Sequence, residues 1–116
     1  MGRLTTHVLD TAQGCPAGGV EIALFSVQPE RRLIAKAITN ADGRLDTPIL
    51  DGENFTPGVY ELVFRVGDYF RGQLDDLSEP LFVDEVPLRF GVAAAGQHYH
   101  VPLLVSPWSY STYRGS

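Results

Sequence analysis

The chain has 116 residues, of which 44% are hydrophobic and 20% charged, so it is long enough and apolar enough for one domain, residues 1–116, with a buried core. Its 9 Lys and Arg against 14 Asp and Glu give a formal net charge of −5, which argues against nucleic-acid binding and against a basic membrane-surface helix. The single cysteine, Cys15, excludes an internal disulfide and a four-cysteine zinc site.

Alternation of apolar and polar residues predicts three strands in the first half of the chain. The first covers residues 4–10, and its odd- and even-numbered residues lie on opposite faces. The second and third are expected at 20–28 and 32–39. Residues 40–43 end in Asp-Gly, which supplies the positive φ angles of a tight turn.

The second half of the chain continues the same pattern. The clearest strand is 59–66, whose alternation directs Tyr60 and Phe64 inward and Glu61 outward, and the polar stretch 67–77 can hold one short helix. Further strand segments are expected at 81–83, 86–92 (broken by Pro87), 97–105 and 108–114. About eight short strands with frequent turns predict an all-β, antiparallel two-sheet sandwich of Greek-key type.

Targeting and membrane signals are weak in this sequence. No apolar run approaches the roughly 20 residues that cross a bilayer, and residues 1–10 have no apolar segment of signal-peptide length. We therefore expect a cytoplasmic protein. A sandwich also leaves edge strands, which makes a symmetric oligomer plausible on physical grounds.

The three histidines are the first candidates for chemistry. His98 and His100 stand two residues apart in a predicted strand, so both side chains point to one face of the sheet, opposite the apolar face of that strand. His7 lies on another predicted strand. The set fits a metal site with His7 as third ligand, general acid–base catalysis near neutral pH, or strand histidines without a chemical role, and spacing alone leaves these open.

Arg44 and the C-terminal tail are the second candidates. Arg44 directly follows the turn at 40–43, so the turn fixes its position, and its guanidinium can donate two parallel hydrogen bonds to a planar oxyanion. A solvated arginine at a turn is nevertheless the commoner case. The tail 106–116 is rich in hydroxyl groups and aromatic rings, including Tyr113 and Ser116, which indicates that it packs against the domain.

Four segments carry a specific resemblance. They are LTTHVLD at 4–10, TNADGR at 39–44, HYHVPLL at 98–104 and SPWSYSTYRGS at 106–116. Together they resemble the 5-hydroxyisourate hydrolases, the transthyretin-related enzymes of urate breakdown. The Tyr-Arg-Gly-Ser ending is highly specific, because the hormone-carrying transthyretins are similar in fold but lack this ending and these histidines. The resemblance covers nearly the whole chain.

The resemblance implies a fold, an assembly and a set of site residues. The fold is a transthyretin-like sandwich of eight strands with one short helix. The assembly is a homotetramer, a dimer of dimers, that binds a small-molecule substrate in the channel between dimers, without nucleic-acid or membrane partners and without cofactor or metal. The implied catalytic residues are His7, Arg44 and His100, and the implied substrate-binding residues are His7, Arg44, Tyr113 and Ser116, with His98 as an accessory.

The implied reaction is the metal-independent hydrolysis of 5-hydroxyisourate to 2-oxo-4-hydroxy-4-carboxy-5-ureidoimidazoline in urate degradation. Water attacks a cyclic amide, either His7 or His100 accepts its proton, and Arg44 offsets the charge that develops on oxygen. The sequence does not decide which histidine is the base. The alternatives are a non-catalytic transthyretin-like protein that binds a small aromatic ligand between subunits, and a three-histidine metal protein.

Overall fold

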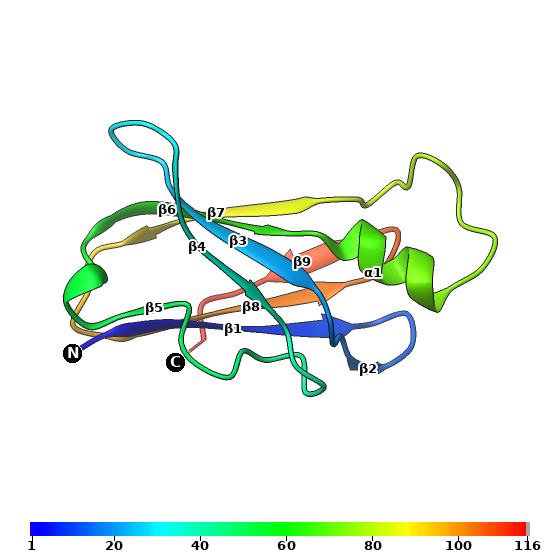
Figure 1. Ribbon diagram of the computed structural model, residues 1–116, viewed down its shortest axis with the longest axis horizontal. Helices are drawn as coiled ribbons and strands as arrows, with labels where there is room; N and C mark the ends of the chain where they lie inside the picture. The colour runs from blue at the N-terminus through cyan, green and yellow to red at the C-terminus, as the bar shows by residue number, and fades with distance from the viewer. Residues whose placement is uncertain (116) are drawn as a thin grey trace.

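Two β-sheets packed face to face make up the computed structural model, which describes residues 1–115 (Figure 1). One sheet has the strand order β2-β1-β8-β9, with β5 also paired to β1, and the other has the order β4-β3-β6-β7. The strands are β1 (Arg3–Asp10), β2 (Cys15–Pro16), β3 (Glu21–Ser26), β4 (Arg32–Ile38), β5 (Leu50–Asp51), β6 (Gly58–Phe64), β7 (Val86–Val92), β8 (His98–Val105) and β9 (Tyr110–Thr112). A 3₁₀ turn, η1 (Gly52–Asn54), precedes β6, and the α-helix α1 (Val66–Gln73) follows it. The predicted sandwich with one short helix is confirmed.

The expectation of purely antiparallel sheets is wrong at one place that matters for the site. Strands β1 and β8 pair in parallel, with Arg3 opposite His98 and Asp10 opposite Val105. The chain leaves β1, builds the other sheet and returns, so these two strands meet through a long connection that permits parallel pairing. The pairing brings the first and last histidine-bearing segments of the sequence side by side.

The core lies between the sheets and follows the predicted alternation. In β1 the buried residues are the even-numbered ones, and in β8 they are the odd-numbered ones together with Pro102. Thr6 and Asp10 are the polar members of this set. The hydroxyl of Thr6 donates to the carbonyl of Val101 at 2.7 Å, so its burial leaves no hydrogen-bonding group unpaired. The odd-numbered residues of β1 and the histidines of β8 consequently face away from the core.

Two strand predictions differ from the structure near β7. Residues 81–83 form no strand, although Leu81 and Val83 are buried against the domain. Pro87, expected to break a strand, lies inside β7. Proline is tolerated there because β7 is an edge strand of its sheet. One side of β7 has no neighbouring strand, so no backbone N–H is needed on that side.

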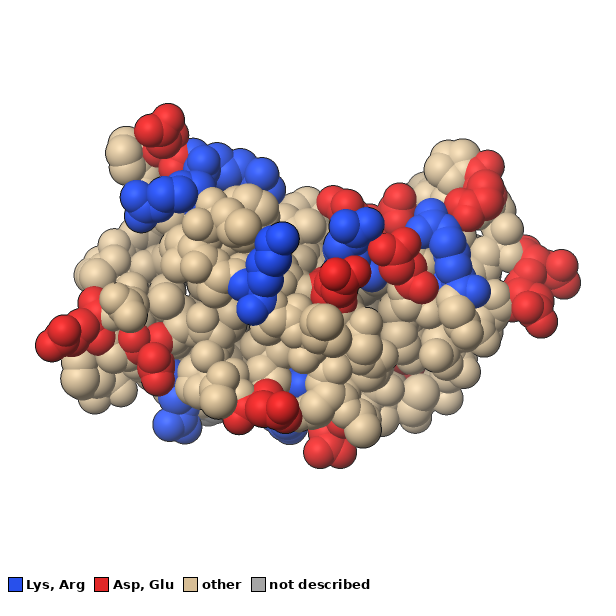
Figure 2. Space-filling view, viewed as in Figure 1, with Lys and Arg blue, Asp and Glu red and all other residues tan. Residues whose placement is uncertain are grey.

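Exposed charges are mixed rather than segregated by sign. Figure 2 shows Lys and Arg interspersed with Asp and Glu on one face of the molecule, without a single basic stripe. Glu61 points to the outer face as predicted, yet only 8% of it is exposed because Arg31 and Arg89 pair with its carboxylate at 3.1 and 3.2 Å.

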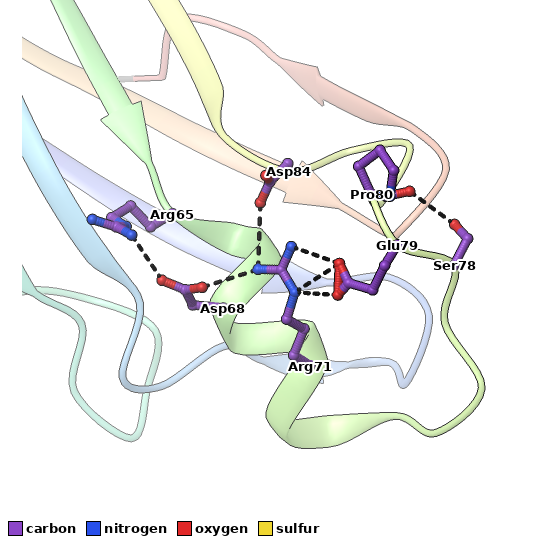
Figure 3. A network of polar contacts seen from close by, with 7 residues as sticks. All are labelled: Arg65, Asp68, Arg71, Ser78, Glu79, Pro80 and Asp84. Carbon is purple, nitrogen blue, oxygen red and sulfur yellow. Dashed lines mark hydrogen bonds and ion pairs between the residues drawn. The ribbon is translucent and has the colours of Figure 1, made fainter.

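The helix α1 and the segment that follows it lie at one end of the sandwich (Figure 1). The guanidinium of Arg71 contacts the carboxylates of Asp68, Glu79 and Asp84, at 3.0, 2.9 and 3.6 Å (Figure 3). This network ties the segment after the helix back onto the helix. Among residues 1–115, none of the helices is long and apolar enough to cross a membrane.

Candidate active site

The outer face of the sheet β2-β1-β8-β9 gathers the predicted histidines. His7 stands on β1, and His98 and His100 stand on β8, and all three are half-buried. The parallel register places Thr5 opposite His100, two pairs before His7 meets Pro102. Because side chains at i and i+2 share a face, these side chains line one surface of the paired strands.

Arg44 is brought to His7 by the turn that precedes it. The side-chain carbonyl of Asn40 accepts the backbone N–H groups of Asp42 and Arg44, at 2.9 and 3.2 Å, which closes the turn. Gly43 has a φ of 75°, and its carbonyl accepts the N–H of Val8 at 2.8 Å. Arg44 then forms an isolated antiparallel bridge with His7, so a turn far from β1 in the sequence places Arg44 next to His7.

His7 is held in one tautomer by this turn. Its Nε2 lies 2.9 Å from the carbonyl oxygen of Asp42. A carbonyl only accepts hydrogen bonds, so Nε2 of His7 carries the proton and donates it. In the neutral ring, the lone pair is therefore on Nδ1.

Thr5 connects the other two histidines, although the sequence pattern did not mark it as a candidate site residue. Its Oγ1 lies 2.7 Å from Nε2 of His98 and 2.8 Å from Nδ1 of His100. The alternation of the first strand already placed Thr5 on the face of His7. Its contacts with His98 and His100 depend on the parallel pairing of β1 with β8, which the sequence alone did not indicate.

The two β8 histidines are biased toward their neutral forms. Burial lowers the pKa of His100, and the nearby charges of Arg44, His98 and His7 lower that pKa further. Burial and the charge of Arg3 lower the pKa of His98 in the same direction. Both imidazoles thus favour the neutral form, which suits a proton acceptor.

The C-terminal tail folds over His100. The N–H of Gly115 donates to the carbonyl of His100 at 2.7 Å, and a surface depression of about 650 Å³ is lined by His100, Tyr113, Arg114 and Gly115. The tail is anchored by Arg114, whose guanidinium lies 3.9 Å above the ring of Tyr99 and donates to Gln97 at 3.0 Å. Tyr113 is 61% exposed at this depression. Ser116, the remaining predicted contact, lies outside the described residues.

The same residues bear on the metal hypothesis. In the described part of the chain, no group of three or more His, Cys, Asp and Glu side chains is arranged to hold a metal ion. His7 is instead engaged with a backbone carbonyl through Nε2, and the β8 pair with a hydroxyl. A three-histidine site gains no support from this arrangement.

Residues 4–115 match the family described as the HIUase/Transthyretin family. The chain belongs to this family. A relative from Pseudomonas aeruginosa, named 5-hydroxyisourate hydrolase, is 62% identical over 117 residues, which cover 100% of this chain and 93% of the relative.

Solved structures of family members share the fold. The crystal structure of an (S)-allantoin synthase aligns with a TM-score of 0.94 and 50% identity, and covers 99% of this chain. The alignment takes in only 44% of the synthase chain, so this protein spans less than half of that longer one. Sea bream transthyretin, solved in complex with thyroxine, aligns with a TM-score of 0.85 and 27% identity over 97% of this chain and 94% of its own.

Proposed function

We propose that the chain hydrolyses 5-hydroxyisourate to 2-oxo-4-hydroxy-4-carboxy-5-ureidoimidazoline. One observation carries the proposal: His7, Arg44 and His100 come from three distant segments and are held together on one sheet face. The 62% identity to a 5-hydroxyisourate hydrolase over the full length supports this substrate for that cluster. A fold match alone would support only the sandwich.

Hydrolysis of the cyclic amide requires a proton acceptor and a cation. Water attacks the carbonyl carbon of a cyclic amide, and one imidazole accepts the proton of the water. The C–N bond then breaks as the imidazolium gives a proton to the leaving nitrogen, which leaves a carboxylic acid that ionises to a carboxylate. General-base assistance of this kind typically contributes ~10²–10⁴-fold. The Arg44 guanidinium holds the substrate and stabilises the charge that develops on the carbonyl oxygen, an effect of about 3 kcal/mol in comparable sites.

The substrate pocket needs more than one copy of the chain in this proposal. The histidine face is the outer face of a sheet, and the depression beside His100 is open to solvent. A homotetramer, built as a dimer of dimers, would close it with a second histidine face and form a channel. Tyr113, Ser116 and His98 would contact the substrate there. The cytoplasmic location stays a prediction.

A second candidate function has one observation in its favour. The likeness to a transthyretin in complex with thyroxine fits a protein that binds a small aromatic ligand without transforming it. Such a binding protein has no need of two neutral imidazoles beside a guanidinium. We therefore expect it to tolerate the loss of His7 or Arg44, whereas the hydrolase does not.

The deciding experiment follows the absorbance of 5-hydroxyisourate generated in place from urate by urate oxidase. We expect His7→Ala, Arg44→Ala and His100→Ala each to lower turnover by at least ~100-fold. Lys36→Ala, an exposed change on the other sheet, serves as the control and should leave turnover unchanged. Near-wild-type decay in all three site variants would contradict the hydrolase assignment.

A further inference from the structure

Thr5 occupies a position between two imidazoles that no functional assignment yet explains. A threonine hydroxyl has one proton to donate and two lone pairs to accept with. Its oxygen lies at hydrogen-bond distance from one nitrogen of His98 and one of His100, at 2.7 and 2.8 Å. The hydroxyl cannot donate to both rings, so at least one of the two nitrogens must itself carry a proton.

In two arrangements of the protons on Thr5, His98 and His100, both short contacts are hydrogen bonds and the hydroxyl proton is donated to one of the rings. In the first, Thr5 donates to Nε2 of His98 and accepts from Nδ1–H of His100, so Nε2 of His100 is bare. In the second, Thr5 donates to Nδ1 of His100 and accepts from Nε2–H of His98, so Nε2 of His100 carries a proton. If both rings donate, the hydroxyl proton finds no acceptor within residues 1–115 and one hydrogen bond is lost.

We propose that Thr5 is a positioning residue that couples the tautomers of His98 and His100 and thereby presents Nε2 of His100 as the proton acceptor. The inference rests on the proposed hydrolysis for its catalytic meaning, whereas the coupling itself follows from the two hydrogen bonds. In the first arrangement both neutral rings are protonated at Nδ1, and in the second both are protonated at Nε2. The two histidines therefore share one tautomer.

The coupling also gives His98 a role other than substrate contact. When Nε2 of His100 takes a proton from water, its Nδ1 proton can pass to the oxygen of Thr5 while the hydroxyl proton passes to Nε2 of His98. The positive charge then resides on His98. When the relay runs in reverse, His98 returns its Nε2 proton to Thr5 and Thr5 returns one to Nδ1 of His100, so that Nε2 of His100 can donate its proton to the leaving nitrogen. No atom is gained or lost in the relay.

The surroundings of the pair are consistent with a mobile proton. His100 faces the charges of Arg44 and His7 in addition to His98, and His98 faces Arg3 on the neighbouring strand. These cations disfavour a proton that stays on either ring. His7 stands apart from the relay, because a carbonyl fixes its proton on Nε2.

The test combines kinetics with the protonation state of the ring nitrogens. Thr5→Val keeps the branched shape and removes the hydroxyl, and Thr5→Ser restores it. We expect Thr5→Val to lower kcat by ~10- to 100-fold with KM within about threefold, and Thr5→Ser to recover most of the loss. Thr11→Val is the matched control, since it also removes one threonine hydrogen bond, from Thr11 to the Val105 carbonyl, away from the histidines.

Proton–nitrogen NMR correlations of ¹⁵N-labelled histidine rings give the second readout, in the wild-type chain and in the variants. We expect His98 and His100 both to be protonated at Nδ1 in the wild type, Thr5→Val to change the tautomer of His100, and His7 to remain protonated at Nε2 throughout. Opposite tautomers in the wild type, protonation of both rings at Nε2, unchanged His100 signals in Thr5→Val, or an unchanged kcat in that variant would each overturn the proposal.

The two readouts separate this inference from the proposed function. The tautomer measurement needs no substrate, so it decides the coupling even if the wild type fails to hydrolyse 5-hydroxyisourate. Conversely, suppose that the wild type hydrolyses the substrate and that His100→Ala abolishes turnover, while His98 and His100 show opposite tautomers. That result would support the proposed function and contradict the role of Thr5. If Thr5→Val does not fold, the wild-type tautomers still decide the coupling.

Discussion

Gly115 is placed where a side chain cannot fit. A Cβ built on it would lie 2.9 Å from Cδ2 of the His100 ring, closer than real Cβ contacts, while its N–H donates to the carbonyl of the same residue. The ring and the tail therefore fix each other, and either one must move to admit a methyl group.

We accordingly expect Gly115→Ala to lower kcat by about tenfold or more, because an imidazole displaced by a fraction of an ångström loses its alignment with the substrate. Thermal unfolding should change little, since the tail contributes little to the core. Gly96→Ala is the control, because a Cβ there meets no atom within 4 Å and its backbone needs no positive φ. Equal turnover in both alanine variants would contradict this role of Gly115.

At this scale the sequence predicted which residues meet but not how they are connected. Alternation placed His98 and His100 on one face, and the turn chemistry of 40–43 fixed Arg44. Neither pattern contains the distance between Thr5 and the β8 histidines, because that distance depends on a pairing between strands more than 90 residues apart. Local rules do not specify such pairings.

At the scale of elements, a buried aspartate joins the end of β1 to the helix. Asp10 is 1% exposed, and its carboxylate accepts the N–H groups of Ala12 and Gln13 at 2.9 Å, the side-chain amide of Gln13 at 2.8 Å and the hydroxyl of Tyr69 at 2.8 Å. Four donors offset the cost of burying the charge. The hydroxyl on α1 thereby links the helix to the β1–β2 turn.

Removing that hydroxyl should weaken the link in a pH-dependent way. Burial, with the hydrogen bond and the charge of Asp10, raises the pKa of Tyr69 above its ordinary value of 10.0, so the folded state favours the protonated phenol. Stability from this group is then complete below pH 10 and falls as the pH rises toward the folded pKa, because the unfolded chain loses the proton first. Tyr69→Phe lacks this dependence.

We expect Tyr69→Phe to lower the free energy of unfolding by about 1–2 kcal/mol near neutral pH, measured by urea denaturation, and to lower it by less at pH 11. Tyr110→Phe is the control, because within residues 1–115 the Tyr110 hydroxyl makes no hydrogen bond and the residue is 47% exposed. If Tyr69→Phe does not lower the free energy of unfolding at neutral pH, or lowers it equally at both pH values, the link is refuted.

The sequence predicted where strands and the helix form more readily than it predicted which strands pair. The 59–66 alternation and the polar stretch after it predicted β6 and α1. The two-residue strands β2 and β5 are too short to show any alternation. They form because their backbones pair with the backbone of β1. Residues 81–83 have strand-like composition, but within residues 1–115 they pair with none of the strands, and Val83 donates its N–H only to the carbonyl of Pro107, at 3.1 Å.

At the scale of the whole molecule, the site lies on an outward sheet face that also carries apolar side chains. Leu9 and Leu104 are register partners on β1 and β8, on the same outer face as His7 and His100. A half-buried leucine pair beside the three histidines is suited to contact a second copy. The proposed tetramer would bury both features at once and would exclude water from the reacting atoms.

A charge placed on this apolar pair should therefore separate assembly from folding. We expect Leu104→Arg to shift the protein below the four-chain mass in analytical ultracentrifugation and to lower turnover by at least tenfold, since a buried unpaired cation opposes the contact. Far-ultraviolet circular dichroism should remain that of a β-sandwich. Ile38→Arg, on the outer face of the other sheet and 61% exposed, should leave mass and turnover unchanged. A fully active Leu104→Arg protein of unchanged mass would show that the histidine face acts without a second copy, and an Ile38→Arg protein that dissociates would assign the contact to the opposite sheet instead.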